Sequence, residues 1–260
     1  MNAEIDYRHE FKKDAQAYDR IVQSKHIRLI YQLEKEVLQD VFSRLPCKDP
    51  EVMDFACGSG RWTRVLETLS DRTLGVDVSP QMISRAKETC RMTEFVVTDI
   101  TSEDVSDALC GRKFDVITAF RFYKNAQDSL RRAVTEALPT YLHEGGLFVF
   151  DLHLNTHSFM GFMANLMRLL QFPRLFGMSE LLIRTMSMAD VRRLFKDSAF
   201  EVVDYYGMGI LPGRSNYVLL PQKWLYAVEA FFTRRQLFRR LSYTLLIVAK
   251  KRNHAPERVQ

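Results

Sequence analysis

The feature that most constrains the fold is segment 52–60, which reads Val-Met-Asp-Phe-Ala-Cys-Gly-Ser-Gly. A short apolar run ends at Asp54, and two glycines, Gly58 and Gly60, follow it before a segment with helical periodicity. Glycine adopts backbone conformations that other residues avoid, and it lets a ligand approach the main chain closely. A strand, a glycine turn and a helix in this order indicate an α/β fold that binds a nucleotide at the carboxyl end of the strand.

The rest of the chain alternates in the same way between apolar runs and segments with helical periodicity. The expected strands are 52–54, 73–78, 95–97, 114–120, 147–152, 201–206 and 241–249. The expected helices are 25–45, 61–69, 80–90, 188–200 and 223–238. A further helix is expected to end before Gly145 and Gly146, with Pro139 bending it or ending its regular part. This alternation predicts βαβ units and therefore a parallel sheet.

The length of 260 residues fits one α/β domain with additions, because single sheets of this kind often run past about 200 residues. Residues 1–46 are expected to form an N-terminal helical extension, which either packs on the core or acts as a lid over the ligand edge. The main domain is expected at 47–251, with a C-terminal helix and last strand at 221–249. Residues 252–260 are expected to be a disordered tail.

Segment 156–183 interrupts the alternation and is expected to be a helical insertion. It is rich in Met, Phe and Leu, whereas Arg168 and Arg174 exclude a helix that spans a bilayer. Three interpretations stay open: a helical pair buried in the core, a lid over a substrate, and a surface that touches a membrane. If the segment is a lid, Phe159 and Met163 are the expected substrate-binding residues.

Composition and charge exclude few classes of function. The net charge of +5 and the pI near 9.0 allow attraction to anionic substrates, membranes or nucleic acid, but they select none of these. The four cysteines have neither metal-ligand nor disulfide spacing, which is typical of proteins in a reducing cytoplasm. The N-terminus has no signal-peptide core, and no apolar run reaches about 18 residues, so a cytoplasmic protein without a transmembrane helix is predicted.

The residues beside the glycine turn distinguish between two classes of cofactor. A dinucleotide site prefers a third glycine after the pair, but Thr63 stands at that position. Asp54 would repel a pyrophosphate, whereas it would attract a cofactor that carries an ammonium and a sulfonium group. Asp77 ends the next expected strand, where folds of this kind present a carboxylate to ribose hydroxyls. Together these residues favour a cationic nucleoside ligand.

Several motifs, in order and at the right spacing, resemble those of the class I S-adenosylmethionine-dependent methyltransferases. The first of their motifs has an acidic residue, three further positions and then Gly-x-Gly, as in segment 54–60. The segments similar to the later motifs are Leu-Gly-Val-Asp-Val-Ser-Pro-Gln-Met at 74–82, Val-Thr-Asp-Ile at 97–100, Phe-Asp-Val-Ile-Thr-Ala-Phe at 114–120 and His-Glu-Gly-Gly-Leu-Phe-Val-Phe at 143–150. The resemblance covers about residues 50–152 and is greatest to the small-molecule type of the family.

The resemblance implies a three-layer sandwich around a mostly parallel seven-stranded sheet. The last strand of such a sheet is antiparallel, and segment 241–249 can supply it. It also implies S-adenosyl-L-methionine as the cofactor. The cofactor-binding residues that it implies are Asp54, Gly58 and Gly60 at the methionine end with Ala56 beside them, Asp77 and Met82 at the ribose and adenine with Val78 beside them, Asp99 and Ile100 along the adenine, and Phe120 facing the cofactor from the fourth strand.

The residues after the fourth strand disfavour some acceptor classes. Methylases of nucleobase or glutamine amides resemble one another in a Pro-Pro-containing box there, whereas this chain reads Ala-Phe-Arg-Phe at 119–122. Cytosine-ring methylases need a Pro-Cys nucleophile in the same region, but Pro46 and Cys47 precede the sheet. Metal-assisted catechol methylases place carboxylates at this strand end, where the chain offers Arg121 instead. No metal is predicted.

Candidate catalytic residues lie in the loops after the fourth and fifth strands, because open α/β sheets bind ligands at the carboxyl edge. His153 and His157 could accept a proton from a hydroxyl, or they could be hydrogen-bonded loop residues. Tyr123 is a further catalytic candidate. Arg121 could bind an anionic acceptor, or it could pair with a carboxylate of the protein.

The sequence therefore predicts a methyltransferase that acts on an apolar small-molecule or lipid-like acceptor, at a site enclosed by segments 1–45 and 156–183. Alternatives are an RNA or protein methyltransferase that uses the basic surface, a non-catalytic cofactor-binding module and, last, a nicotinamide dehydrogenase. Nucleic acid is disfavoured because no recognition motif or stacking platform is evident. The basic, aromatic segment 224–240 either lies on an anionic membrane or is a solvated helix face. Monomer and homodimer both stay open.

Overall fold

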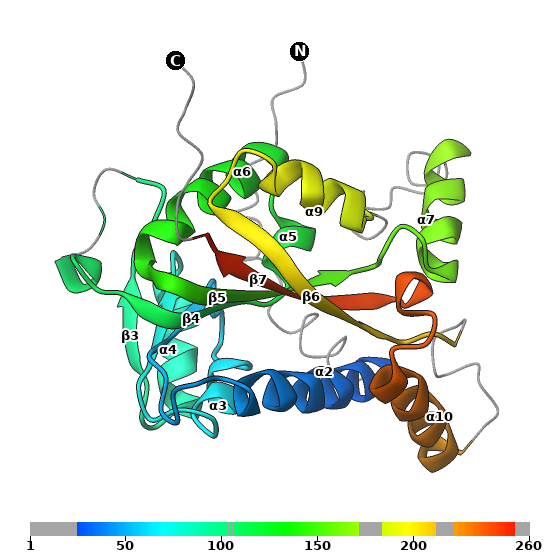
Figure 1. Ribbon diagram of the computed structural model, residues 1–260, viewed down its shortest axis with the longest axis horizontal. Helices are drawn as coiled ribbons and strands as arrows, with labels where there is room; N and C mark the ends of the chain where they lie inside the picture. Colours follow the sequence, from blue (N-terminus) through cyan, green and yellow to red (C-terminus); the bar gives the residue numbers. More distant parts are fainter. Residues whose placement is uncertain (1–24, 103–104, 106, 172–183, 212–220, 253–260) are drawn as a thin grey trace.

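A computed structural model describes residues 25–102, 105, 107–171, 184–211 and 221–252 of the chain. These residues form a seven-stranded sheet with helices on both faces (Figure 1). The strands are β1 (Val52–Phe55), β2 (Thr73–Asp77), β3 (Glu94–Val97), β4 (Phe114–Ala119), β5 (Leu142–His153), β6 (Phe200–Met208) and β7 (Thr244–Lys251). The longer helices are α2 (Lys25–Ser43), α4 (Pro80–Thr89), α6 (Asp128–Ala137), α7 (Phe159–Leu169), α9 (Met188–Phe195) and α10 (Gln222–Arg235). Shorter helices are α3 (Thr63–Leu66) and α5 (Phe122–Asn125).

The strand order is β3-β2-β1-β4-β5-β7-β6. Strands β1 to β5 pair in parallel, whereas β7 is antiparallel to both β5 and β6. The predicted fold class is thus confirmed: a mostly parallel seven-stranded sheet lies between two helical layers, and its last strand is antiparallel. The chain order reverses between β1 and β4, so the carboxyl ends of these two strands flank the crevice in which sheets of this kind bind ligands.

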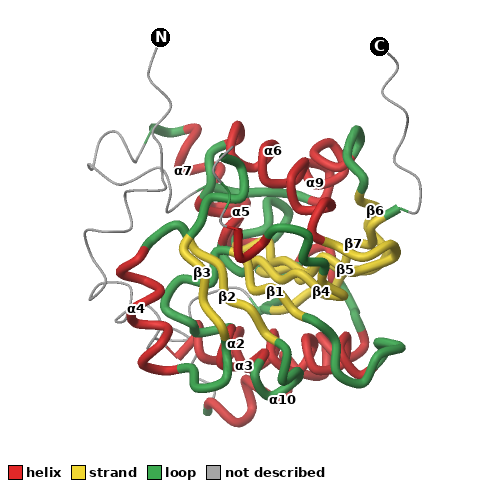
Figure 2. Tube along the Cα trace, turned by 90° about the vertical axis from the view of Figure 1, so that its left-hand side faces the viewer, coloured by secondary structure: helices red, strands yellow, loops and turns green. Residues whose placement is uncertain are grey.

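Two hydrophobic cores lie on the two faces of the sheet, and strand β7 shows how one sequence serves both. Leu245 and Ile247 belong to the core under α5, α6 and α9, whereas Leu246 and Val248 belong to the core under α2, α3 and α10. Successive side chains of a strand point to opposite faces, so an uninterrupted apolar run fits a strand that is covered on both sides. Figure 2 shows these helical layers above and below the strands.

Helix α2 forms because its apolar residues recur every three or four positions and bury one face. Ile30, Leu33, Val37 and Val41 are buried in the second core, and the helix ends before Pro46. The helix therefore packs on the sheet. Its N-terminal half also reaches the rim of the ligand crevice, where Tyr31 packs against Trp62.

The prediction of a helix that continues to just before Gly145 is wrong for the second half of that helix. Helix α6 ends at Ala137, a short 3-10 turn (Leu138–Tyr141) contains Pro139, and β5 already begins at Leu142. Proline lacks a backbone N–H and cannot continue a helix, which explains the early end. The glycines lie inside β5, where the register against β4 shifts, and a side chain at Gly146 would approach the His143 carbonyl oxygen to 3.0 Å.

The helical insertion predicted at 156–183 begins as expected with α7, but residues 172–183 lie outside the described residues. The predicted disordered tail is also outside them, apart from Arg252. The described residues contain no helix with the length and apolar character that a membrane span requires.

Candidate active site

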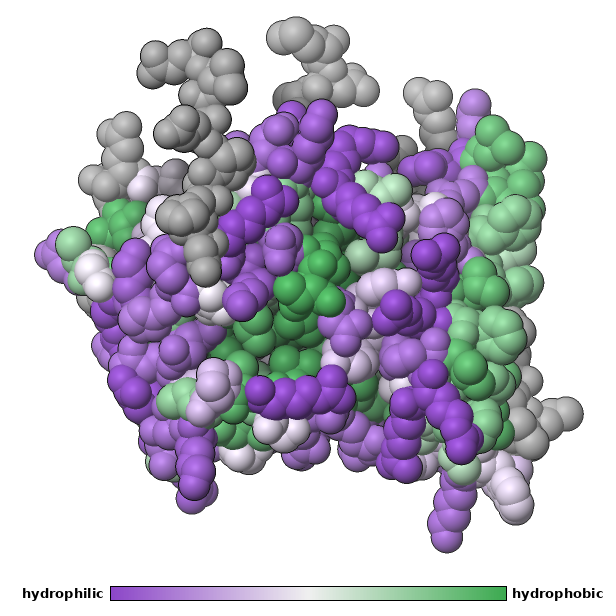
Figure 3. All heavy atoms as spheres, in the orientation of Figure 1, coloured by the Kyte–Doolittle hydropathy of each residue, from purple (hydrophilic) through white to green (hydrophobic). Residues whose placement is uncertain are grey.

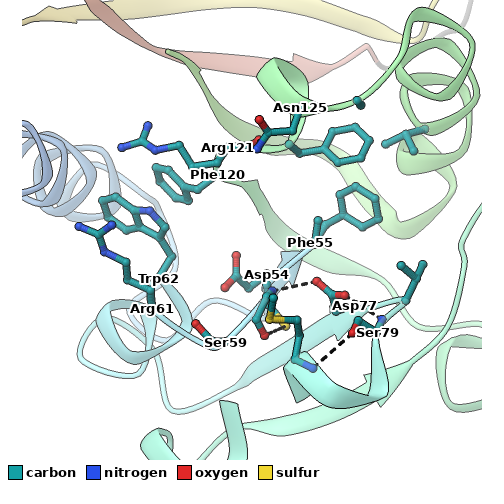
Figure 4. A pocket seen from close by; sticks show the side chains of 18 of the residues that line it. Asp54, Phe55, Ser59, Arg61, Trp62, Asp77, Ser79, Phe120, Arg121 and Asn125 are labelled. Carbon is teal, nitrogen blue, oxygen red and sulfur yellow. Dashed lines mark hydrogen bonds between the residues drawn. The ribbon is translucent and has the colours of Figure 1, made fainter. Parts of the chain in front are cut away.

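A cavity of 480 Å³ opens at the carboxyl ends of β1, β2 and β4. Figure 4 shows its two sides: Asp54 and Asp77 lie on the side of the glycine turn, and an aromatic wall with Trp62 and Phe120 stands across from them. Cavities of about 300–1,000 Å³ with apolar walls and a few fixed polar groups are typical sites for small molecules.

The glycine turn owes its shape to three left-handed positions in one short stretch. Ala56, Gly58 and Gly60 have φ angles of 54°, 55° and 79°. A side chain at Gly58 would meet nothing within 4 Å, so glycine is needed there for its backbone conformation alone. At Gly60 a Cβ atom would also lie 3.0 Å from the Cβ atom of Ala86, so this glycine lets the turn pack against α4.

Asp77 lies at the end of β2 and fastens the turn. Its Oδ2 atom accepts a hydrogen bond from the backbone N–H of Gly58 at 2.8 Å, and its Oδ1 atom accepts one from the N–H of Ser79 at 2.9 Å. Burial raises the pKa of the Asp77 carboxyl, although these backbone hydrogen bonds counteract the shift. A carboxylate has about four acceptor positions. Asp77 therefore keeps acceptor capacity toward the cavity, where a pair of ligand hydroxyls would fit.

Asp54 is the most deeply buried carboxylate that lines the cavity, with 1% exposure. The hydroxyls of Thr63 and Thr118 donate hydrogen bonds to its two oxygens, at 2.6 and 2.8 Å. Burial raises the pKa of Asp54 to about 6, and the two threonine hydrogen bonds oppose this shift. A cation bound in the cavity would favour the charged form of this carboxyl.

Arg121 joins three elements at the far side of the cavity. Its guanidinium donates two parallel hydrogen bonds of 2.7 Å to Glu34 of α2, and it also pairs with Asp151 of β5. Burial alone would lower the pKa of Arg121, but Asp151 and Glu34 raise it above its usual value. Burial raises the pKa of Glu34, and the charge of Arg121 counteracts this shift. Arg121 lines the cavity, but its charge is already compensated by two carboxylates.

The aromatic wall combines the residue before α3, the residue after β4 and a residue of α2. Trp62 stacks on Phe120 with ring centroids 3.8 Å apart and planes inclined by 12°. Tyr31 of α2 packs against Trp62 at 4.8 Å, and the Arg61 guanidinium lies 4.2 Å above the Tyr31 ring. Helix α2 therefore supports the wall of the cavity from behind.

Most of the cofactor-binding residues expected from the sequence lie together at the cavity. Those that line it are Asp54, Ala56, Gly58, Asp77, Val78, Met82, Asp99 and Phe120. Two do not line it: Gly60 packs on α4, and Ile100 is buried in the core with 4% exposure. For these two residues the structure supports a role in shaping the site, through packing.

The expected catalytic residues lie away from the cavity lining. The Tyr123 hydroxyl is buried against the Thr135 hydroxyl at 2.9 Å, and burial raises its pKa. The ring nitrogens of His153 lie 3.1 Å from the hydroxyls of Thr244 and Tyr243. His157 is exposed at the start of the segment that leads into α7.

The expected substrate residues Phe159 and Met163 also lie outside the lining, on α7. Sequence reasoning missed a different group that does line the cavity: Phe55 of β1, Phe122 of α5, and Leu130 and Val134 of α6. The signal available for Phe122 was its position just after the carboxyl end of β4, whereas Leu130 and Val134 lie further along the chain, on α6.

The fold and this cavity define a class of protein: a three-layer α/β protein that binds a nucleoside ligand at the switch point between β1 and β4. The family model described as "Methyltransferase domain" matches residues 26–205, which is most of the chain. The chain belongs to the methyltransferase-domain family. The predictions of a class I methyltransferase and of S-adenosylmethionine as its cofactor are confirmed at the level of this family.

Two curated relatives match parts of the chain. The ubiquinone biosynthesis O-methyltransferase of Methylococcus capsulatus is 31% identical over 107 residues, which are 40% of this chain and 44% of that protein. The 235L protein of Invertebrate iridescent virus 6, named as a methyltransferase, is 32% identical over 71 residues, which are 26% of this chain and 25% of that protein. The chain thus spans less than half the length of these relatives.

Solved methyltransferases share the fold over nearly the whole chain. The magnesium protoporphyrin IX methyltransferase of Synechocystis PCC 6803, with bound S-adenosylmethionine, superimposes with a TM-score of 0.59, 14% identity and coverage of 96% of this chain and 100% of that one. The N-methyltransferase NodS of Bradyrhizobium japonicum gives a TM-score of 0.54, 16% identity and coverage of 90% and 91%. At such identities the likeness concerns the fold.

Proposed function

We propose that this protein transfers the methyl group of S-adenosylmethionine to an apolar small-molecule or lipid-like acceptor. The observation that carries the acceptor class is the apolar wall of the cavity beyond the carboxylates. Phe55 and Phe122 meet edge to face at 5.0 Å, and Leu130 and Val134 continue this surface along α6. Such a wall gains free energy by removing apolar ligand surface from water, whereas a polar or charged acceptor would lose its hydration there.

The residues around the turn fit the cofactor. Asp77 would accept hydrogen bonds from two vicinal hydroxyls, and Asp54 would attract a cationic centre. The left-handed backbone at Gly58 leaves the main chain open to a ligand. When bound, the cofactor supplies a methyl group on a sulfonium, which reacts by in-line displacement. The protein's part is to hold acceptor and donor in line and to exclude water.

No histidine is among the described residues that line the cavity, and burial raises the pKa of the thiol of Cys57, which does line it. Positioning and desolvation are therefore the contributions that we propose for the cavity. For acceptors that must lose a proton, His153 and His157 remain the proposed bases, although neither lines the cavity as it stands.

The test is release of S-adenosylhomocysteine from S-adenosylmethionine over a panel of apolar phenols, quinols, amines and fatty acids, with RNA and protein mixtures as separate arms. We expect turnover with an apolar member and none with RNA or protein. Leu130→Gln places an amide in the apolar wall and should raise KM for that acceptor about tenfold, at unchanged cofactor affinity. Arg132→Gln, at an exposed position of the same helix, serves as the control. Turnover only with RNA or protein would contradict the proposal.

A further inference from the structure

Helix α7 exposes several large apolar side chains, whereas Met160 packs in part against Leu154 and Ala164. Gly161 and Ala164 are the buried residues of this helix, and a Cβ atom at Gly161 would lie 1.9 Å from the Asn155 carbonyl oxygen. The helix is therefore seated on its small residues, with backbone close to backbone. On the other side Phe159, Phe162, Leu169 and Leu170 are exposed by 55%, 62%, 78% and 53%.

A second set of exposed apolar side chains lies on α10 and on the connection from α10 to β7. Trp224 and Phe231 stand seven positions apart on one face of α10, with 67% and 46% exposure. Phe238 and Leu241, in the connection, are exposed by 62% and 51%. Figure 3 shows the two sets as a green band over α7 and α10 along the right edge of the molecule. We call this band the α7–α10 surface.

The two halves of the α7–α10 surface are joined at one edge of the sheet. His153 at the end of β5 pairs with Thr244 at the start of β7, so α7 leaves the sheet where the connection enters it. The Asn155 side chain then donates hydrogen bonds to the carbonyl oxygens of Arg240 and Ser242, at 2.8 and 2.9 Å. These bonds hold α7 and the connection in a fixed relation, at the carboxyl edge where the cavity also opens.

Arginines accompany the apolar side chains of this surface. Arg168 is exposed on α7, and Arg235 and Arg240 are exposed on α10 and the connection. Arg234 is also exposed on α10, but it pairs with Glu36 of α2 at 3.5 Å. The Arg235 guanidinium lies 4.2 Å from the centre of the Phe231 ring, so cation and aromatic face occur together. Large exposed apolar surfaces mark docking sites, and Phe, Trp and Leu next to Arg are typical of elements that lie in the headgroup region of an anionic bilayer.

We propose that the α7–α10 surface docks the protein on an anionic lipid bilayer, with the apolar side chains in the interface and the arginines among the headgroups. Charge complementarity selects this occupant. The arginines on this surface would repel one another if two copies met face to face, whereas anionic lipids attract them, with a gain for each cation near the surface. This docking is independent of the methyl acceptor.

The test is flotation of the full chain with vesicles of phosphatidylcholine and phosphatidylserine, and with vesicles of phosphatidylcholine alone. We expect binding to the anionic vesicles that weakens with salt, and much less binding to the neutral ones. Trp224 gives a second readout, because the other tryptophan, Trp62, is buried with 5% exposure. Its emission should shift to the blue on anionic vesicles, and in Trp224→Phe this shift should disappear.

The double substitution Phe162→Glu, Leu169→Glu should reduce binding to anionic vesicles about tenfold or more, since each change removes apolar contact and adds repulsion. Met92→Glu is the control, because Met92 is 62% exposed between α4 and β3, at the opposite edge of the sheet from β6. Binding of S-adenosylhomocysteine by all variants would show that they fold. Equal vesicle binding by the double variant and the control would overturn the proposal. So would a wild-type dimer that ignores vesicles and that the double variant converts to monomer.

Discussion

Asp77 connects the backbone of the glycine turn with the expected ribose position, so its replacement should lower the affinity for the cofactor. Asp77→Asn keeps the shape but replaces one acceptor oxygen by a donor, which disrupts the hydrogen bond from Gly58 or from Ser79. Hydrogen bonds to a charged group contribute about 1.5–3 kcal/mol, so we expect the Kd for S-adenosylhomocysteine to rise about 10- to 100-fold in calorimetry. Asp71→Asn, at an exposed position, is the control. An unchanged Kd in Asp77→Asn would refute this assignment.

The raised pKa of Asp54 predicts that both the stability of the protein and its affinity for the cofactor depend on pH. Its pKa is raised from 3.8 to about 6, so its contribution to stability is fully present below 3.8 and is lost as the pH rises through about 6. Cofactor affinity should change in the opposite direction, because a sulfonium is attracted only by the ionised carboxyl. Calorimetric titrations with S-adenosylmethionine should show tighter binding at pH 7.5 than at pH 5. In Asp54→Asn this difference should shrink; an equal difference in both proteins would assign it to another group.

At the scale of single residues, the motif positions were predictable because each has a local reason. Gly58 needs its backbone conformation, and Asp77 ends a strand beside the turn. Tyr123 could not be placed in this way. It comes soon after β4, but α5 starts there and turns its ring into the core under Phe148 and Phe150. Which way a side chain points after a strand depends on the first turn of the next helix, and this is not visible in strand periodicity.

At the scale of elements, the link between α2 and the sheet depends on the buried Glu34–Arg121–Asp151 cluster. Glu34→Gln removes one charge from this cluster and leaves a buried arginine with a single carboxylate. Loss of one partner of a buried ion pair costs about 3–5 kcal/mol, and the amide can keep one hydrogen bond, so we expect a loss near 3 kcal/mol in urea unfolding.

The control for this change lies on the same helix. Asp40 pairs with Arg44 in an exposed ion pair, so Asp40→Asn should cost less than about 1 kcal/mol. Equal losses in the two variants would show that the buried cluster does not anchor α2. A loss confined to Glu34→Gln would instead support α2 as a fixed wall of the cavity.

Periodicity predicted the elements well wherever one face of an element is buried. Helix α2 was expected at 25–45 and is observed at Lys25–Ser43, because its apolar positions all meet the same core. The expected helix at 61–69 shrinks to Thr63–Leu66, where the glycine turn and the stacking of Trp62 occupy its start. The cluster around Arg121 could not be predicted, because it joins residues of three elements that are distant in the sequence.

At the scale of the whole molecule, the mostly parallel sheet followed from the alternating pattern, and the cofactor class followed from the motifs, whereas the acceptor did not. The cofactor crevice is built from local turns that recur at fixed spacing along the chain. The proposed acceptor side consists of Phe55, Phe122 and Leu130, ordinary apolar residues whose common surface exists only after folding. Apolar residues that form a binding wall and those that fill a core have the same sequence pattern.

Because the cavity joins β1, β2 and β4 with α2 behind its wall, cofactor binding should stabilise the chain as a unit. At a ligand concentration of 100 times Kd, the gain in unfolding free energy is about 2.7 kcal/mol. For a chain of this size each kcal/mol corresponds to a shift of about 2–4 °C in Tm, so S-adenosylhomocysteine should raise Tm by about 5–10 °C in a thermal scan. NAD should leave Tm unchanged, because Asp54 repels a pyrophosphate and Thr63 replaces the third glycine. A shift with NAD and none with S-adenosylhomocysteine would reverse the choice of cofactor class.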